Sequence, residues 1–133
     1  MEYRSGYKYQ LHSDFYVDTG IIIPNTIEID YITLAQAGTL YTRKGYAWDG
    51  PSGPTIDTKN FMRGSLVHDA LYQLMRNEML PLSRRGEADR LLQKMCKEDG
   101  MSSLRAWWVY QGVAKFGKKS AMAGNIKQVH IAP

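Results

Sequence analysis

The spacing of apolar residues changes between residues 49 and 60, and this change limits the chain to an α+β fold. Before it, residues 26–32 place isoleucine or tyrosine at alternate positions with acidic residues between them, as in a strand with one buried face. After it, Val67, Ala70, Leu71 and Leu74 recur at helical spacing. We therefore expect antiparallel strands first and helices after them.

Short strands are predicted throughout the first 48 residues. Segments 7–11, 15–17, 26–32, 38–42 and 45–48 are rich in β-branched and aromatic residues, and turn residues separate them. Such strands are typical of an antiparallel meander or a small barrel-like sheet. Residues 49–60 contain a cluster of prolines and glycines and are predicted to form a loop.

About three helices are predicted within residues 61–118. Pro81 ends the first helix, Gly100 ends the second, and Ser102 or Ser103 caps the third. Residues 119–133 are small and polar and are predicted to be extended. A chain of 133 residues is long enough to bury a core, so we expect one domain spanning residues 1–133.

The composition argues against two classes of protein. No run of about 18 apolar residues occurs, so no transmembrane helix is predicted, and the first residues lack the apolar core of an export signal. The single cysteine, Cys96, excludes an internal disulfide framework. It lies on an apolar helical face, where a buried thiol is expected.

His68 and Asp69 are adjacent within the helical stretch, and Asp89 follows 21 residues after His68 on the next predicted helix. Neighbouring helix positions point about 100° apart, so His68 and Asp69 face different partners. His68 has the chemistry of a general base, and Asp89 can hold one nitrogen of its ring. Two antiparallel helices should bring a His68 nitrogen within about 2.6–3.2 Å of an Asp89 oxygen.

Asp69 has the chemistry of a ligand for a hard cation such as Ca²⁺, which prefers oxygen. Backbone carbonyls near Gly50 and Gly53 in the preceding loop can add further ligands. Tyr72, one helical turn after His68, can hydrogen-bond either Asp89 or that loop. The candidate catalytic residues are therefore His68, Asp89 and Tyr72, and the candidate calcium ligands are Asp69, Gly50 and Gly53.

A structural role explains the same residues. His68 and Asp69 can cross-link the junction of strands and helices. Asp69 can pair with an arginine, and the candidates are Arg63, Arg76 and Arg84. The loop at residues 49–54 can be a rigid turn and nothing more.

The motifs at residues 46–54, 66–72 and 88–89 resemble an uncharacterised domain family found in tailed-phage and prophage genomes. The similarity covers about residues 8–95, and the His-Asp-Ala-Leu-Tyr block at residues 68–72 is its most specific part. The resemblance implies a phage source, and hence a location in the virion or the host cytoplasm. It implies no particular activity.

A more distant similarity concerns the order of the motifs. Phospholipases A2, especially the short domain of parvovirus capsid proteins, have a glycine-rich calcium loop, a helix bearing His-Asp-x-x-Tyr and a second helix bearing Ala-Asp. The order of motifs in this chain resembles that arrangement, with the glycine-rich segment at residues 50–53, His-Asp-x-x-Tyr at residues 68–72 and Ala-Asp at residues 88–89. By this resemblance His68 activates a water, Asp89 orients His68 and Asp69 binds Ca²⁺. The helix-linking disulfides of the secreted enzymes are absent, and the first 48 residues have no counterpart.

Three functional hypotheses follow. The first is a phage-encoded hydrolase with a His-Asp site, most concretely a Ca²⁺-assisted, phospholipase A2-like enzyme acting on esters or phospholipids. The alternative is a non-enzymatic virion or assembly protein that uses an aromatic and basic C-terminal interface. A cell-wall hydrolase or its accessory is a third idea. A zinc hydrolase is not favoured, because His12 and His130 lie in weakly patterned regions.

The C-terminal third of the chain is aromatic and basic. No acidic residue follows Asp99, whereas five basic residues do. Trp107, Trp108 and Tyr110 together span about 300° of a helix, so at least one of them or Phe116 is expected to be exposed or to meet another chain. The predicted partners are other phage proteins, which we favour, or an anionic membrane surface. No specific nucleic acid is predicted.

Overall fold

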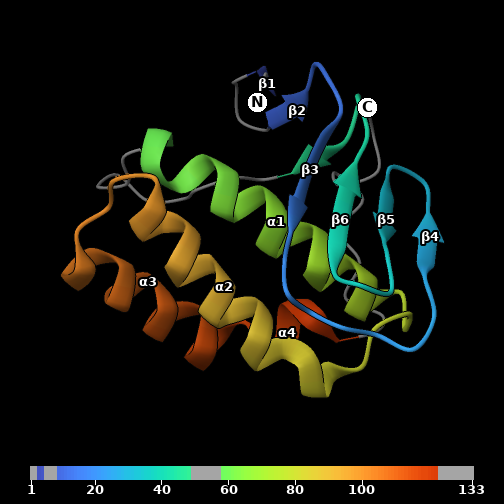
Figure 1. Cartoon of the computed structure of the whole chain (residues 1–133). Coiled ribbons are helices and arrows are strands. Elements are labelled where there is room, and N and C mark those ends of the chain that lie inside the picture. Colours follow the sequence, from blue (N-terminus) through green and yellow to red (C-terminus); the bar gives the residue numbers. More distant parts are fainter. Residues whose placement is uncertain (1–2, 5–8, 49–57, 123–133) are drawn as a thin grey trace. The chain divides into compact units, whose positions relative to one another are not determined.

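The structure, a computed structural model, describes residues 3–4, 9–48 and 58–122, and the chain divides into two compact units. Strands form the first unit and helices the second, in the order β1 to β7 followed by α1 to α4 (Figure 1). The predicted α+β class, with antiparallel strands before helices, is confirmed.

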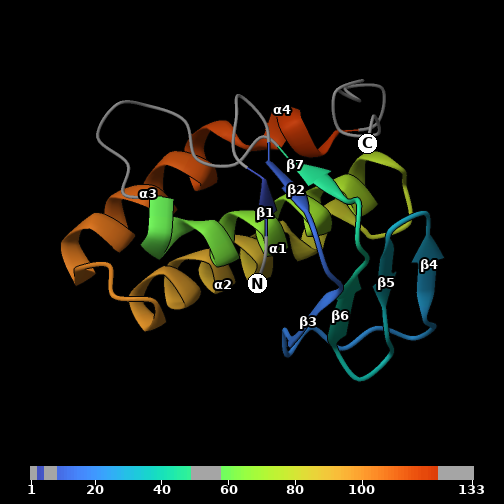
Figure 2. The ribbon, with the colours of Figure 1, turned by 90° about the horizontal axis from the view of Figure 1, so that it is seen from above.

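The strand unit contains two antiparallel sheets. β1 (Tyr3–Arg4), β2 (Tyr9–Leu11) and β7 (Ala47–Trp48) form a three-stranded sheet in that order. β3 (Phe15–Asp18), β6 (Thr39–Thr42), β5 (Ile32–Leu34) and β4 (Ile27–Ile29) form a four-stranded sheet. The sequence predicted one meander or barrel-like sheet. Instead β7 pairs with β2, and the strands divide between two sheets (Figure 2).

Residues 26–32 include a hairpin turn and do not form the single strand that their alternation predicted. β4 ends at Ile29 and β5 begins at Ile32, and these two residues are partners in the register of the pair. Tyr31, the second residue of the turn, has a positive φ of 70°, a conformation that non-glycine residues adopt mainly in turns. Alternation of apolar residues does not reveal a turn this short.

One face of the four-stranded sheet is buried and the other is solvated. Ile32, Leu34 and Leu40 are at most 1% exposed. Tyr16 and Tyr41, partners on β3 and β6, are exposed. This division between faces is common in antiparallel sheets.

The helical unit consists of three long helices and one short helix. α1 comprises Thr58–Arg76, α2 Arg85–Glu98, α3 Ser103–Phe116 and α4 Lys118–Ala121, with a 3-10 turn at Leu82–Arg84 before α2. Ser102 caps α3 as expected, because its hydroxyl accepts the backbone N–H of Arg105 at 3.2 Å. α1 begins earlier than predicted, within the expected loop, and α4 forms where an extended tail was expected. No helix among the described residues is long and apolar enough to cross a membrane.

α2 packs against both α1 and α3 and runs antiparallel to α1 (Figure 1). Apolar side chains of all three long helices and of the α2–α3 connection form one cluster, made of Leu92, Cys96, Met101 and Ala106 with Phe61, Val109 and Val113 packed against it. Burial raises the pKa of the Cys96 thiol to about 12. The side chain is therefore an uncharged apolar group at neutral pH, as the sequence predicted.

A glycine permits the close approach of α1 to α2. A Cβ added at Gly64 would lie 3.0 Å from the Leu92 side chain and 3.4 Å from the Cys96 sulfur. Gly112, inside α3, has nothing within 4 Å of the same position. Residue 64 must therefore stay small for α1 to lie against α2, whereas residue 112 has room for a larger side chain.

We predict that Gly64→Val lowers the free energy of unfolding by about 1–3 kcal/mol, the usual cost of overpacking a core. Gly112→Val is the matched control, because the same change beside open space should alter stability by less than about 0.5 kcal/mol. Urea denaturation followed by circular dichroism measures both variants. Equal stability of the two would contradict the close contact at Gly64.

Candidate functional site

The antiparallel pair α1 and α2 brings His68 and Asp89 together. The Nε2 atom of His68 lies 2.7 Å from Oδ1 of Asp89, inside the range that the sequence predicted. The Asp89 side chain is 2% exposed and that of His68 is 13% exposed. The carboxylate is therefore buried, whereas part of the His68 side chain is exposed to solvent. A buried carboxylate needs polar partners, and His68 is one of them.

Tyr72, one turn after His68, is the second partner. Its hydroxyl donates to the same Oδ1 of Asp89 at 2.6 Å, and its ring lies against the His68 ring with centroids 4.1 Å apart. Burial, together with the hydrogen bond to the carboxylate, raises the pKa of Tyr72 above its usual value. The phenol therefore stays protonated and acts as a donor. Of the two partners that the sequence left open, Tyr72 contacts Asp89.

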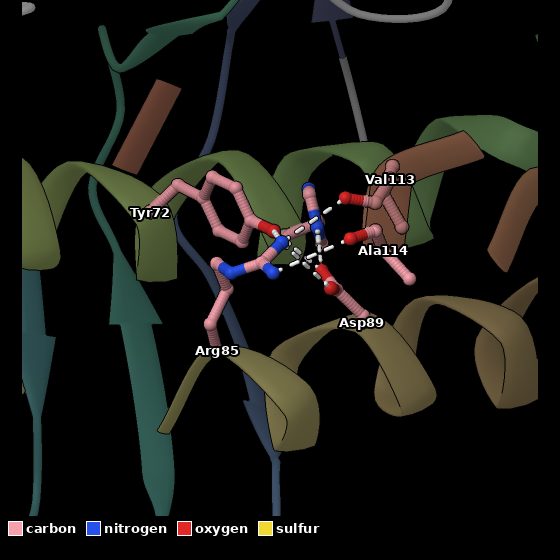
Figure 3. A network of polar contacts seen from close by, with 6 residues as sticks. Tyr72, Arg85, Asp89, Val113 and Ala114 are labelled. Atoms are coloured by element: carbon pink, nitrogen blue, oxygen red, sulfur yellow. Dashed lines mark hydrogen bonds and ion pairs between the residues drawn. The ribbon is translucent and has the colours of Figure 1, made fainter. Parts of the chain in front are cut away.

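Arg85 is the third partner, and it was not predicted from the sequence. Its Nη1 atom lies 3.4 Å from Oδ2 of Asp89 and donates to the Tyr72 hydroxyl at 3.3 Å (Figure 3). The spacing of Arg85 and Asp89, one helical turn, is a signal for an ion pair that the sequence does contain. Oδ1 of Asp89 thus has its partners on α1, and Oδ2 has its partner on α2.

The same guanidinium also caps the C-terminal end of α3. Nη1 donates to the carbonyl of Val113 at 3.2 Å, and Nη2 donates to that of Ala114 at 3.3 Å (Figure 3). The Val113 carbonyl also accepts the backbone N–H of Gly117 at 2.8 Å, so Arg85 adds a second donor there, and a cation at this end of a helix is favoured by the helix dipole. Arg85 therefore joins α3 to the His68–Asp89 pair, a contact that sequence spacing does not reveal.

A second glycine lies beside this cluster. A Cβ at Gly117 would be 2.7 Å from the Tyr72 hydroxyl and 2.5 Å from the carbonyl oxygen of Val113. Such distances are shorter than van der Waals contact, so a larger residue would displace the tyrosine or the helix end. The residue that follows α3 therefore keeps space for the Tyr72 hydroxyl.

Only part of the predicted metal site lies among the described residues. Asp69 is half-buried on α1 beside His68, whereas Gly50 and Gly53 lie outside the described residues. Within residues 3–4, 9–48 and 58–122, no group of three or more His, Cys, Asp or Glu side chains is arranged to hold a metal ion. Ca²⁺ takes about 6–8 oxygen ligands, so loop carbonyls would have to complete any site that uses Asp69.

Two of the three arginines that the sequence offered as partners of Asp69 pair with other carboxylates. Arg63 contacts Asp99 at 3.0 Å, and this hydrogen bond raises the pKa of its guanidinium. Arg84 forms an ion pair with Glu87 near the start of α2. Both arginines are therefore engaged with acidic residues of α2 and its C-cap.

The fold and the cluster together define a class of protein: an α+β chain in which two antiparallel helices hold a His–Asp pair with a tyrosine and an arginine. The chain belongs to the DUF1353 family, proteins of unknown function, which it matches over residues 25–113. The match includes His68, Tyr72, Arg85 and Asp89. No curated protein and no solved structure matches the chain.

We predict that Arg85→Met lowers the free energy of unfolding by about 2–3 kcal/mol, because it removes charge-assisted hydrogen bonds from a buried carboxylate and from the end of α3. Arg85→Lys keeps the charge but lacks the forked donors, so it should recover part of the loss.

Arg90→Met is the matched control, because Arg90 is an exposed arginine on the same helix and its loss should have little effect. Urea denaturation measures all three variants. An Arg85→Met protein as stable as Arg90→Met would show that the contacts of Arg85 do not stabilise the fold.

Proposed function

We propose that the chain is a phage-encoded hydrolase in which His68 activates water for attack on an ester. One observation carries the proposal: the buried carboxylate of Asp89 lies 2.7 Å from Nε2 of His68, while the His68 side chain remains partly exposed. General-base catalysis needs an oriented imidazole that substrate and water can reach. Phospholipid esters are the proposed substrates, because the order of the motifs resembles that of phospholipases A2.

The hydrogen-bond pattern supports a different role for each ring nitrogen. A carboxylate can only accept, so Nε2 carries the proton that it shares with Asp89, and Nδ1 keeps a lone pair. Among the described residues no hydrogen bond engages Nδ1. In the proposed reaction Nδ1 takes a proton from water as the water attacks the ester carbonyl. It then returns that proton to the leaving alkoxide.

Asp89, Tyr72 and Arg85 act as positioning residues in this proposal. Asp89 orients the imidazole and stabilises the imidazolium that forms during the attack. Tyr72 and Arg85 hold the carboxylate in place from two sides, at Oδ1 and at Oδ2. Because the Tyr72 hydroxyl stays protonated, it adds a donor without adding a second negative charge.

Calcium is the proposed cofactor, with Asp69 and backbone carbonyls near Gly50 and Gly53 as its ligands. When bound, the ion supplies positive charge that polarises the ester carbonyl. Asp69 is adjacent to His68 in α1. The proposed ligand and the proposed base are therefore fixed to one another by a single helix.

A second, non-enzymatic function is favoured by the number of helices that the same cluster connects. His68, Asp89 and Arg85 join α1, α2 and α3, as a purely structural cross-link would. In a phage virion or assembly protein, the cluster would stabilise the helical unit and carry out no chemistry. The two functions differ in the expected effect of losing His68.

We predict that His68→Gln lowers the rate of phospholipid or ester hydrolysis by a factor of about 10²–10⁴, the usual contribution of a general base. The melting temperature should change little, because the glutamine amide still offers an N–H donor to the buried Asp89 carboxylate. His12→Gln is the matched control, since His12 is an exposed histidine of the strand unit. Vesicle hydrolysis and thermal unfolding measure the two effects. Equal hydrolysis by wild type and His68→Gln, or no hydrolysis by wild type, would favour the structural function.

We predict that calcium titration by calorimetry shows binding to the wild type that Asp69→Asn abolishes. Binding to the folded state alone is stabilising, so calcium should also raise the melting temperature of the wild type. Asp18→Asn, at an exposed aspartate of β3, is the control and should bind as the wild type does. Equal heats for wild type and Asp69→Asn would remove Asp69 from the proposed site.

A further inference from the structure

Helix α3 exposes a row of large apolar side chains. Leu104, Trp107 and Trp108 are 67%, 44% and 62% exposed, and their spacing of three and four residues places them on one face of the helix. The other face is packed, since Ala106 is fully buried and Val109 lies in the cluster shared with α2. The expectation that at least one C-terminal aromatic is exposed is therefore confirmed.

The side chains of Trp107 and Trp108 pack against each other. Their rings meet edge to face with centroids 5.1 Å apart, a favoured geometry for an aromatic pair. Each ring therefore packs on its neighbour while keeping about half of its surface in solvent. The pair therefore forms one apolar patch on the exposed face of α3.

Positive charge adjoins this apolar row. Lys115 follows Leu104 by about three helical turns and so shares its face of α3, and Lys118 begins α4. Both lysines are exposed. No acidic residue occurs after Asp99, so α3 and α4 carry no negative side chain. The face is thus apolar toward its amino end and cationic toward its carboxyl end.

We propose that the α3 face formed by Leu104, Trp107, Trp108 and Lys115, together with Lys118 at the start of α4, docks on an anionic lipid bilayer. Negatively charged headgroups complement a surface whose only charges are cationic. Tryptophan is enriched where headgroups meet hydrocarbon. An amphipathic helix with aromatic and basic residues lies in the plane of that interface. The proposal does not depend on hydrolysis.

The size of the apolar row favours a bilayer over a protein partner. At these exposures the three side chains offer roughly 400 Å², given about 150–250 Å² for a whole aromatic side chain. A stable protein interface takes about 800 Å² from each partner. A bilayer sets no such threshold, because shallow insertion of a few side chains adds to electrostatic attraction. The sequence alone favoured a protein partner, and the exposed area together with the uniform charge reverses that preference.

Co-sedimentation of the full chain with vesicles tests the proposal. The vesicles contain phosphatidylcholine alone or mixed with phosphatidylglycerol, and the His68→Gln protein is used without calcium so that no lipid is hydrolysed. We expect binding only to vesicles with phosphatidylglycerol, weakening as salt is raised. The double variant Trp107→Ala, Trp108→Ala should lower the bound-to-free ratio about tenfold. Lys115→Glu combined with Lys118→Glu should remove the salt-sensitive part of binding.

Two matched controls separate the α3 face from general charge and aromatic content. Lys94→Glu combined with Lys97→Glu makes the same change of charge at exposed positions of α2. Tyr16→Ala removes an exposed aromatic ring from the strand unit. Both controls should bind vesicles as the parent protein does. Circular dichroism establishes that each variant is folded before its binding is compared.

Three results would overturn the proposal. The first is equal binding by the parent protein and the double tryptophan variant, and the second is equal binding to vesicles with and without phosphatidylglycerol. The third is no vesicle binding together with tryptophan-dependent self-association in analytical ultracentrifugation, which would assign the α3 face to a protein contact. Since hydrolysis plays no part in the readout, a wild type that binds vesicles but hydrolyses nothing would reject only the proposed hydrolase.

Discussion

The helical unit depends on how one buried carboxylate is neutralised. Asp89 is 2% exposed, and an unpaired charge at such a position would be strongly destabilising. His68 and Tyr72 of α1 contact one of its oxygens, and Arg85 of α2 contacts the other. Because Arg85 also binds the last carbonyls of α3, the neutralisation of this single charge fixes three helices relative to one another.

The need of the buried Asp89 carboxylate for partners also fixes the orientation of the His68 imidazole. An isolated surface histidine is free to change rotamer, whereas the His68 ring is held on one edge by Asp89 and on its face by the Tyr72 ring. Among the described residues, these contacts involve Nε2 and the ring face and leave Nδ1 without a hydrogen bond. The proposed catalytic role rests on the 13% exposure of the His68 side chain, because substrate and water must reach the imidazole.

The features that could be predicted from the sequence are those that a regular spacing of residues along the chain reveals. Alternation and helical spacing predicted strands before helices, and the 21-residue spacing of His68 and Asp89 places them opposite each other on an antiparallel pair. The features that were missed join segments with no periodic relation. They are the turn at Tyr31 that divides one alternating run, the pairing of β7 with β2, and the reach of Arg85 to α3. α4 was missed because 4 residues are too few to show a period.

The two faces of helix α3 differ in their surroundings, because one packs against α2 and the other is exposed. Its inner face needs only small side chains such as Ala106 and Val109 to lie against α2, and Arg85 secures its last turn. Among the described residues, the packing of the helical unit therefore gives no reason for Trp107 and Trp108 on the outer face, where about half of each side chain is exposed. Burying apolar surface contributes about 25 cal/mol of free energy per Å². The exposed tryptophan surface gains this stabilisation only when a partner covers it. An anionic bilayer provides both the apolar layer and the negative charge that this face lacks.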